Sequence, residues 1–182
     1  MRNDAEEILS LLALLHIPGI GDLTAKLLCN HFGSAKKALY APKGKLLGIH
    51  GIGANTAQAI FDQQKEAVDK ANKQLVLCEK HNVEIVSFFS SEYPELLKKN
   101  TDAPTILYAK GNLNVLKKEK MVAVVGTRSA TTYGKKITEE ICKELVANDI
   151  CVVSGLAYGI DIVAHKSTLQ AEGETIAVLG GG

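Results

Sequence analysis

The sequence predicts a small all-α domain followed by an α/β domain with a parallel, doubly wound sheet. Two observations predict this order. A short Ile-x-Gly-Ile-Gly turn occurs twice in the first third of the chain, at residues 17–21 and at residues 49–53. Beyond it, short β-branched runs alternate with helical patterns. We place the boundary near residues 74–82 and assign residues 1–78 to the helical domain and residues 79–182 to the α/β domain.

Each of the two turns lies between helical patterns, with residues 8–16 and 23–31 around the first and a long helix over about residues 54–80 after the second. The glycines permit a tight turn, and the intervening isoleucine anchors it in the helical core. This is the helix-hairpin-helix signature, in which turn amides and the next helix N-terminus can meet a phosphate. The candidate phosphate contacts are Gly19, Gly21, Gly51 and Gly53.

A second interpretation is a compact helical domain that uses the hairpins only as turns, as in sterile-alpha-motif (SAM)-like modules. Basic residues are few near the turns: Lys26 flanks the first hairpin, but Gln58 holds the matching place in the second. Asp22 also sets a negative charge beside the first turn. Both interpretations stay open, and we do not expect tight duplex binding from this domain.

The α/β domain is expected to contain five strands and three helices. The strands are predicted at 83–88, 105–109, 121–126, 150–154 and 175–180, and the helices at 93–99, 131–148 and 159–172. Right-handed crossovers between such elements imply a Rossmann-like parallel sheet. The last strand leads directly into Gly180-Gly181-Gly182, so we expect this core to be incomplete at its carboxyl end.

Two strands run into small-residue loops that precede helices. Residues 121–125 enter Gly126-Thr127-Arg128, and residues 150–153 enter the loop over residues 154–161. In a parallel sheet both loops lie at the carboxyl ends of strands, where ligands bind and helix N-termini offer N–H groups to anions. Arg128 is one of only two arginines among 21 basic side chains, and its planar fork suits phosphate oxygens. The loops therefore predict a phosphate site.

The candidate binding residues lie on these loops or on the helix after the first: Gly126, Thr127, Arg128, Lys135, Ser154, Gly155, Tyr158 and Gly159. Thr127 and Ser154 would donate hydroxyl groups, and Tyr158 would stack on a base or merely cover the loop. The alternatives are turn glycines, a helix-capping threonine and an arginine paired with a carboxylate. Lys135 belongs to a run of basic residues from Lys117 to Lys136 that is either a solvated face or the surround of the phosphate loop.

Asp161 and His165 are expected to support the loop. A carboxylate aimed at a phosphate would repel it, so Asp161 should cap the helix or hold the loop amides. His165 lies four residues later on the same helix face, and a packed or hydrogen-bonded role is favoured because no activated nucleophile lies nearby. We predict no catalytic residue, no metal and no cofactor.

Composition limits the class of protein. The hydrophobic content of 46% is ample for a packed core, and the net charge of +1 argues against a uniformly basic nucleic-acid binder, so any DNA site must be local. The four cysteines form no Cys-x-x-Cys pair, which disfavours a disulfide framework or zinc site. No apolar run approaches membrane-spanning length and the N-terminus lacks a signal-like pattern, so we expect a cytoplasmic protein without a membrane partner.

Residues 80–182 resemble the DprA/Smf family (DNA processing protein A). The motifs that carry the resemblance are Tyr93-Pro94-Glu95-Leu96-Leu97, residues 104–111, Gly126-Thr127-Arg128, residues 154–161 with Ala164-His165, and residues 175–180. The resemblance implies a non-enzymatic protein that binds and protects incoming single-stranded DNA, forms a homodimer at full length and loads the RecA recombinase in natural transformation. Many family members have a basic residue where this chain has Tyr158.

The alternative function is that of an enzyme similar to the nucleoside-monophosphate phosphoribohydrolases, whose glycine-rich loops also bind a 5′-phosphate. Those enzymes use a Pro-Gly-Gly-x-Gly-Thr stretch followed by a catalytic glutamate, whereas this chain has Leu179 before its final glycines. A dinucleotide-dependent oxidoreductase is disfavoured because no Gly-x-Gly-x-x-Gly turn follows a predicted strand.

Overall fold

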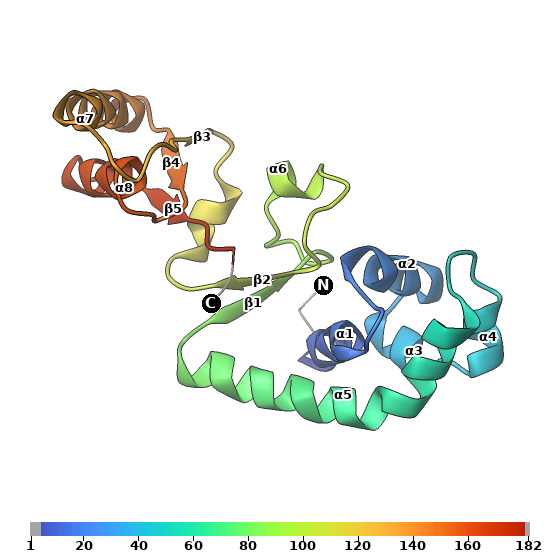
Figure 1. Ribbon diagram of the computed structural model, residues 1–182. Coiled ribbons are helices and arrows are strands. Elements are labelled where there is room, and N and C mark those ends of the chain that lie inside the picture. The colour runs from blue at the N-terminus through green and yellow to red at the C-terminus, as the bar shows by residue number, and fades with distance from the viewer. Residues whose placement is uncertain (1–4, 181–182) are drawn as a thin grey trace. The chain divides into compact units, whose positions relative to one another are not determined.

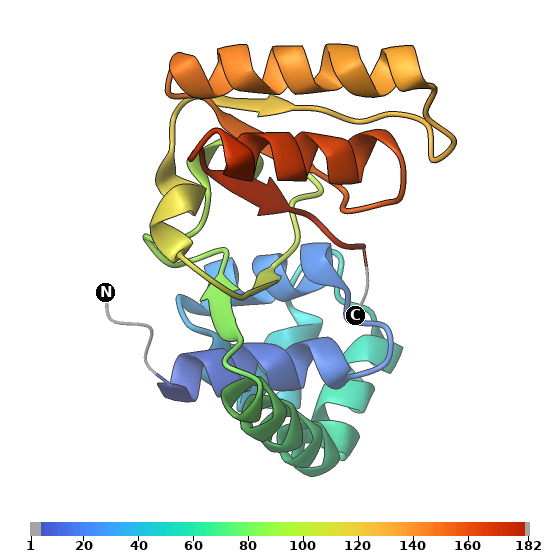
Figure 2. The same cartoon turned by 90° about the vertical axis from the view of Figure 1, so that its left-hand side faces the viewer.

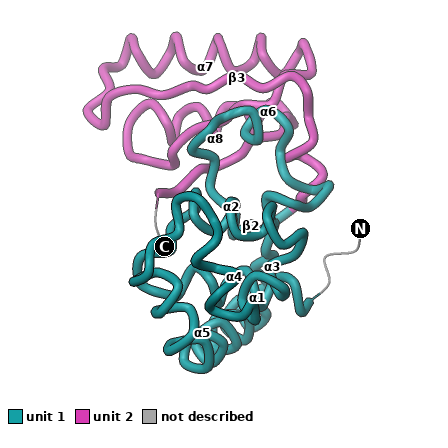
Figure 3. The backbone as a smooth tube through the Cα atoms, turned by 90° about the vertical axis from the view of Figure 1, so that its right-hand side faces the viewer, with its two compact units in different colours: residues 1–111 teal, residues 112–182 magenta. Residues whose placement is uncertain are grey.

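The computed structural model describes residues 5–180 and contains two compact units, residues 1–111 and residues 112–182 (Figure 3). The final Gly181-Gly182 of the sequence motif therefore lies outside the described residues. The division between the units falls later than the boundary near residues 74–82 that the sequence suggested. The first unit contains the helical segment and the first two strands, and the second contains the parallel sheet.

The described part of the first unit begins with the helices α1 (Ala5–His16), α2 (Asp22–Phe32), α3 (Ala35–Leu39), α4 (Lys43–Leu47) and α5 (Ala54–Lys80). The long α5 has the length that the sequence predicts, and α1 lies against it (Figures 1 and 2). Leucines of α1 such as Leu11 and Leu14 meet Leu28 of α2 and Ile60 of α5 in one buried core. This apolar contact holds the helices together because burying each such side chain contributes about 1.5–3 kcal/mol.

The two predicted hairpins are present, one before α2 and one before α5. Gly19 and Gly51 have φ of +83° and +92°, a conformation that favours glycine strongly. The isoleucines between the paired glycines, Ile20 and Ile52, are 5% and 6% exposed and belong to the helical core. The sequence therefore placed both turns correctly, and each ends at the N-terminus of a helix.

The strands β1 (Glu84–Ser87) and β2 (Ile106–Ala109) correct one expectation. They pair antiparallel with each other, on either side of the short helix α6 (Glu95–Lys98), and do not join the parallel sheet. Their position follows from contacts with the helices, since the Thr105 amide donates to the carboxylate of Asp22 on α2. The prediction that all five strands form one parallel sheet was wrong because strand pattern does not specify the pairing partner.

The second unit is an α/β layer, which confirms the predicted fold class. It contains the 3₁₀ helix η1 (Leu113–Lys117), the strands β3 (Met121–Ala123), β4 (Cys151–Ser154) and β5 (Thr175–Ala177), and the helices α7 (Thr132–Ala147) and α8 (Ile160–Gln170). The parallel strands have the order β3-β4-β5, and α7 and α8 lie side by side on one face of the sheet (Figure 1). The described part of the chain contains no helix long and apolar enough to cross a membrane.

Candidate functional site

The loops after β3 and β4 meet at the carboxyl ends of neighbouring parallel strands. Asp161, in the first turn of α8, joins them: one carboxylate oxygen accepts a hydrogen bond from the Gly126 amide and the other accepts one from the Gly155 amide, each at 3.2 Å. Asp161 is 6% exposed. It therefore holds both loops in place, which is one of the two roles that the sequence suggested for it.

Tight packing against Ile160, the first residue of α8, explains the glycine at position 126. A Cβ on Gly126 would lie 2.7 Å from Cγ1 of Ile160, too close for a side chain, whereas a Cβ on Gly134 of α7 would lie at an ordinary contact distance of 3.7 Å from its Cδ1. The Ile160 amide also donates to the Thr127 carbonyl at 3.2 Å. Ile160 thus contacts the first loop and the first turn of α7 from the start of α8. An isoleucine at this position of the sequence did not by itself predict these contacts.

Gly159 closes the second loop onto the first. Its φ is +88°, and a Cβ there would overlap the carbonyl oxygens of Thr127 and Arg128. Only glycine fits this position, because both the backbone conformation and the space exclude a side chain. Gly159 is therefore the turn residue that the sequence predicted. It is also the point at which the backbones of the two loops come into close contact.

Three of the candidate binding residues use polar groups in bonds within the protein. The Ser154 hydroxyl donates to the Val124 carbonyl at 2.7 Å, and Ser154 is 3% exposed, so it is not available to a ligand. The amides of Gly126 and Gly155 are already bonded to Asp161. Ser154 was expected to donate to a ligand, and its internal bond is the correction, because a polar group that folding removes from water needs a partner within the protein.

The groups that stay available lie in the next residues of both loops. Within residues 5–180, the amides of residues 156–159 make no hydrogen bond, and Arg128 is exposed and has no ion pair or side-chain hydrogen bond. Thr127 Oγ1 accepts from the Ser129 amide at 3.2 Å and keeps its own proton to donate. Consecutive free amides in a turn form an anion-binding concavity, and here a free guanidinium accompanies them.

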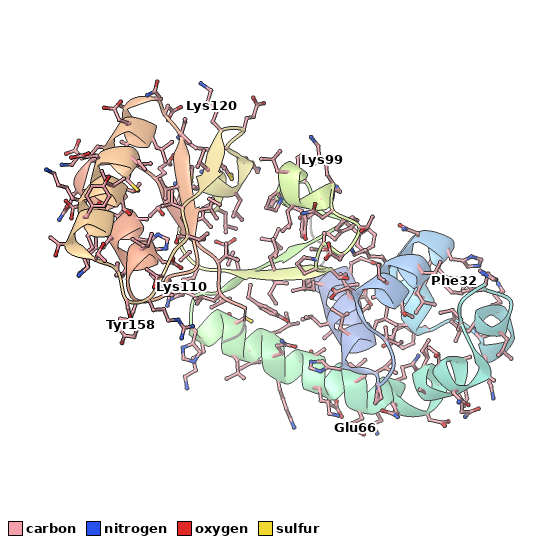
Figure 4. The ribbon with its side chains drawn as sticks, turned by 45° about the horizontal axis from the view of Figure 1, so that its top comes forward. Phe32, Glu66, Lys99, Lys110, Lys120 and Tyr158 are labelled. Atoms are coloured by element: carbon pink, nitrogen blue, oxygen red, sulfur yellow. The ribbon has the colours of Figure 1, made fainter. Side chains whose placement is uncertain are left out.

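A hollow of about 420 Å³ lies at this point, lined by Arg128, Leu156, Ala157, Tyr158 and Ile162. Among the described residues that line it, Arg128 is the charged one. Tyr158 is 84% exposed and points away from the ribbon into open space (Figure 4). Sequence reasoning named Arg128 and Tyr158 but not Leu156 or Ile162, because a single apolar residue gives no signal of a site until its neighbours are known.

The predicted run of basic residues divides into paired and free members. Lys118 contacts Asp149 at 2.6 Å and Glu174 at 2.7 Å, and these hydrogen bonds raise the pKa of its ammonium group. Lys135, on the first turns of α7, is exposed and forms no ion pair with any described residue. Lys118 thus ties η1 to the rest of its unit, whereas Lys135 remains free for an anionic ligand.

His165 lies one turn along α8 from Asp161 and is 4% exposed. Its Nδ1 lies 2.7 Å from Thr175 Oγ1, and that hydroxyl donates to the Val152 carbonyl at 2.7 Å. Nδ1 must therefore carry the proton, and the buried Nε2 has no partner among the described residues. Burial lowers the pKa of His165, although the charge of Asp161 opposes that shift. The ring is a packed support of the β4–β5 pair and is out of reach of a substrate.

In the first unit, the one lysine beside the first hairpin is used internally. Lys26 is 9% exposed, its ammonium group donates to the Ala103 carbonyl, and Nζ lies 4.5 Å from the centre of the Phe88 ring. Beside the second hairpin, Gln58 bonds to Lys43 and Asp62. Lys26 is thus buried and used within the protein, whereas Arg128 of the α/β loops is exposed and has no partner among the described residues.

Comparison with known proteins identifies the family. The family model of DNA recombination-mediator protein A matches residues 84–182, more than half of the chain, and a helix-hairpin-helix motif model matches residues 10–75. The chain belongs to the DNA recombination-mediator protein A family, also known as DprA/Smf. The recognition made from the motifs is confirmed.

Relatives of this family are similar over most of the chain. The DNA processing protein DprA of Bacillus subtilis is 34% identical over 69% of the chain, and protein Smf of Synechocystis is 33% identical over 94% of it. The crystal structure of DprA from Streptococcus pneumoniae superposes on the whole chain with a TM-score of 0.72 at 30% identity and is itself covered to 59%. The chain spans 42% and 43% of the length of the two curated relatives.

Proposed function

We propose that this chain binds single-stranded DNA at the α/β loops, with Arg128 and the amides of residues 156–159 bound to backbone phosphate. The observation that carries the proposal is the exposed, unpaired guanidinium beside four consecutive unbonded amides. Thr127 donates a hydrogen bond to the same anion, and Lys135 adds charge from α7. Tyr158 offers an exposed ring for stacking on a base.

Binding of this kind should be largely indifferent to sequence. Amides and a guanidinium contact phosphate oxygens, which are the same at every nucleotide, and stacking accepts any base. Single strands are favoured over duplex because a base within a duplex is already stacked and paired. Gly51 and Gly53 of the second hairpin are secondary candidates for phosphate contact, as are Gly19 and Gly21 of the first.

The positions of Asp161 and His165 support a site that binds DNA without changing it chemically. The Asp161 carboxylate is occupied by two amides, and the unpaired nitrogen of His165 is buried. Neither is within reach of a substrate in the hollow as a general acid or base. This supports a binding protein over a phosphoribohydrolase.

The wider proposal follows from family membership. The intact protein would act in DNA processing during recombination in the cytoplasm, protect incoming single strands in natural transformation, form a homodimer and load the RecA recombinase. The description of the family as a recombination mediator supports a role beside the recombination machinery.

The test compares labelled oligo-dT with a matched duplex across a salt series. We expect tighter binding to the single strand and an affinity that falls steadily as salt rises, because each phosphate contact releases counterions. The same protein is incubated with AMP to look for released adenine, and none should appear. Equal or tighter binding to duplex would assign the contact to the hairpins, and release of adenine would replace the proposal with the enzyme.

A further inference from the structure

A long segment of the helical unit, residues 23–61, contains no aspartate or glutamate. An even distribution of the chain's 20 acidic side chains would place about four in a stretch of this length. The same segment contains five lysines, which are Lys26, Lys36, Lys37, Lys43 and Lys45. Two of them are used within the protein, because Lys26 is buried and Lys36 forms an ion pair with Glu6 at 2.5 Å.

The other three lysines keep an uncompensated charge at the surface of α3 and α4. Lys37 and Lys45 are exposed, and their side chains form neither an ion pair nor a hydrogen bond with any described residue. Lys43 is also exposed, and its ammonium group donates to Oε1 of Gln58, which is a neutral acceptor. The acid-free sequence therefore becomes a local excess of positive charge in the folded unit.

The core holds the backbone that carries these lysines in place. Ala38 and Leu39 of α3 and Leu46 of α4 are each at most 1% exposed. The side chain of Gln64 on α5 donates to the Leu39 carbonyl and so fixes the end of α3. Tyr40, which follows α3 directly, is 54% exposed. An ordered backbone thus presents three ammonium groups together with one exposed aromatic ring.

We propose that the helical unit has its own contact surface for single-stranded nucleic acid, formed by Lys37, Tyr40, Lys43 and Lys45. The occupant follows from charge complementarity, since uncompensated ammonium groups attract a polyanion and gain affinity by releasing its counterions. The exposed ring favours a single strand over a duplex, because unpaired bases can stack on it. This surface uses side chains of α3 and α4 and not the amides of the glycine turns, and it does not depend on Arg128.

The test removes the three charges together and measures binding of oligo-dT across a salt series. The variant K37Q/K43Q/K45Q should bind oligo-dT about tenfold more weakly than the native chain at low salt. The slope of log affinity against log salt concentration should become shallower by about two, because three lost phosphate contacts release fewer counterions. Tyr40→Ala should weaken binding about fivefold and leave the slope unchanged, because stacking involves no counterion.

A matched control changes three exposed lysines of α5 in the same unit. The variant K65Q/K73Q/K80Q removes the same number of charges. It should leave both the affinity and the salt slope nearly unchanged, because acidic residues on the same helix already offset these lysines: Asp62, Glu66, Asp69 and Glu79. Thermal unfolding should show that all of the variants are folded.

Arg128→Ala separates this surface from the site in the α/β unit. In that background a residual, salt-sensitive binding of oligo-dT should remain, and K37Q/K43Q/K45Q should abolish it. If Arg128→Ala bound oligo-dT as tightly as the native chain while K37Q/K43Q/K45Q lost affinity, the proposed function would fail and the surface on α3 and α4 would stand.

Three other results would overturn the surface. An equal loss of affinity in the two triple variants would show that only net charge matters. Unchanged binding by Tyr40→Ala, with equal losses for oligo-dT and a matched duplex in K37Q/K43Q/K45Q, would remove the assignment to single strands. If K37Q/K43Q/K45Q lost binding to poly-glutamate and kept its affinity for oligo-dT, the partner would be an acidic polypeptide.

Discussion

The hairpins of the helical unit and the loops of the α/β unit both place glycines just before helix N-termini, yet their nearest cations differ. Lys26, beside the first hairpin, is buried, with its ammonium group held by the Ala103 carbonyl and the Phe88 ring. Arg128, in the α/β loop, is exposed and unpaired in the described structure. The difference teaches that a glycine turn with a nearby cation indicates a ligand site only where folding leaves that cation free.

Substitution of glycine by alanine should separate the two regions most strongly. Gly159 and Gly19 have similar φ values of +88° and +83°, but a Cβ would meet two backbone carbonyls at Gly159 and open space at Gly19. Gly159→Ala should lower the free energy of unfolding by about 3 kcal/mol or more, from backbone strain and overlap together. Gly19→Ala should lower it by about 1–2 kcal/mol, from backbone strain alone.

Urea unfolding followed by circular dichroism measures both losses. Binding of oligo-dT by the folded fraction of each variant is the companion measurement, and it should fall for Gly159→Ala and not for Gly19→Ala. Equal losses of stability would show that the α/β loop relaxes around the added methyl group, and the close contact between the two loops would then be unimportant.

Substitution of Arg128 should lower DNA affinity, whereas substitution of Lys26 should lower stability. Arg128→Ala should weaken binding of oligo-dT by about 1.5–3 kcal/mol, the range for charge-assisted hydrogen bonds, with little change in stability. Lys26→Ala should lower the free energy of unfolding by about 1–3 kcal/mol, because the Ala103 carbonyl loses its donor and the core loses the lysine stem. Its DNA affinity, normalised to folded protein, should be unchanged.

Arg128→Lys sharpens this comparison. It should restore only part of the affinity, since an ammonium group is a point charge and lacks the planar fork of a guanidinium. Anisotropy titrations and melting temperatures on all three variants give the result. If Arg128→Ala lowered the melting temperature while binding stayed intact, Arg128 would be a structural residue like Lys26.

A fall in pH should lower the stability of the α/β unit through protonation of His165. This is the smallest of the expected effects. Because burial lowers the pKa of His165 in the folded state, the unfolded chain binds the proton more readily. The stability due to the neutral ring is fully present above its ordinary pKa of 6.5 and is lost as the pH falls below that value toward the lowered folded pKa. His165→Gln, which keeps a donor for Thr175 and cannot be protonated, should lose this part of the pH dependence.

Hydrogen exchange at pH 7.5 and pH 5 locates the effect. In the native chain, protection at pH 5 should decrease first in the peptides of α8 and β5, which the ring joins, and less in the hairpin peptides. A pH dependence that is identical in His165→Gln would assign the acid effect to carboxylates such as Asp149, whose pKa is lowered by its hydrogen bond to Lys118.

Local pattern was sufficient for most elements of the fold. The predicted helix over residues 131–148 is α7 at Thr132–Ala147, because Thr131 caps it and its apolar positions recur at helical spacing. The long α5 and both hairpins were found for the same reason. The pairing of β1 with β2 was not, since it depends on contacts such as the one from Thr105 to Asp22, 83 residues apart in the chain.

The sequence by itself determined where the candidate site lies, since two strands run into glycine-containing loops and one loop carries Arg128. Only the tertiary structure decided which polar groups remain for a ligand. Asp161 uses the amide of Gly126, 35 residues away, and Ala103 uses the ammonium of Lys26, 77 residues away. Hydrogen-bond partners so distant in the chain are set by packing, and a group that packing has satisfied is no longer free to bind.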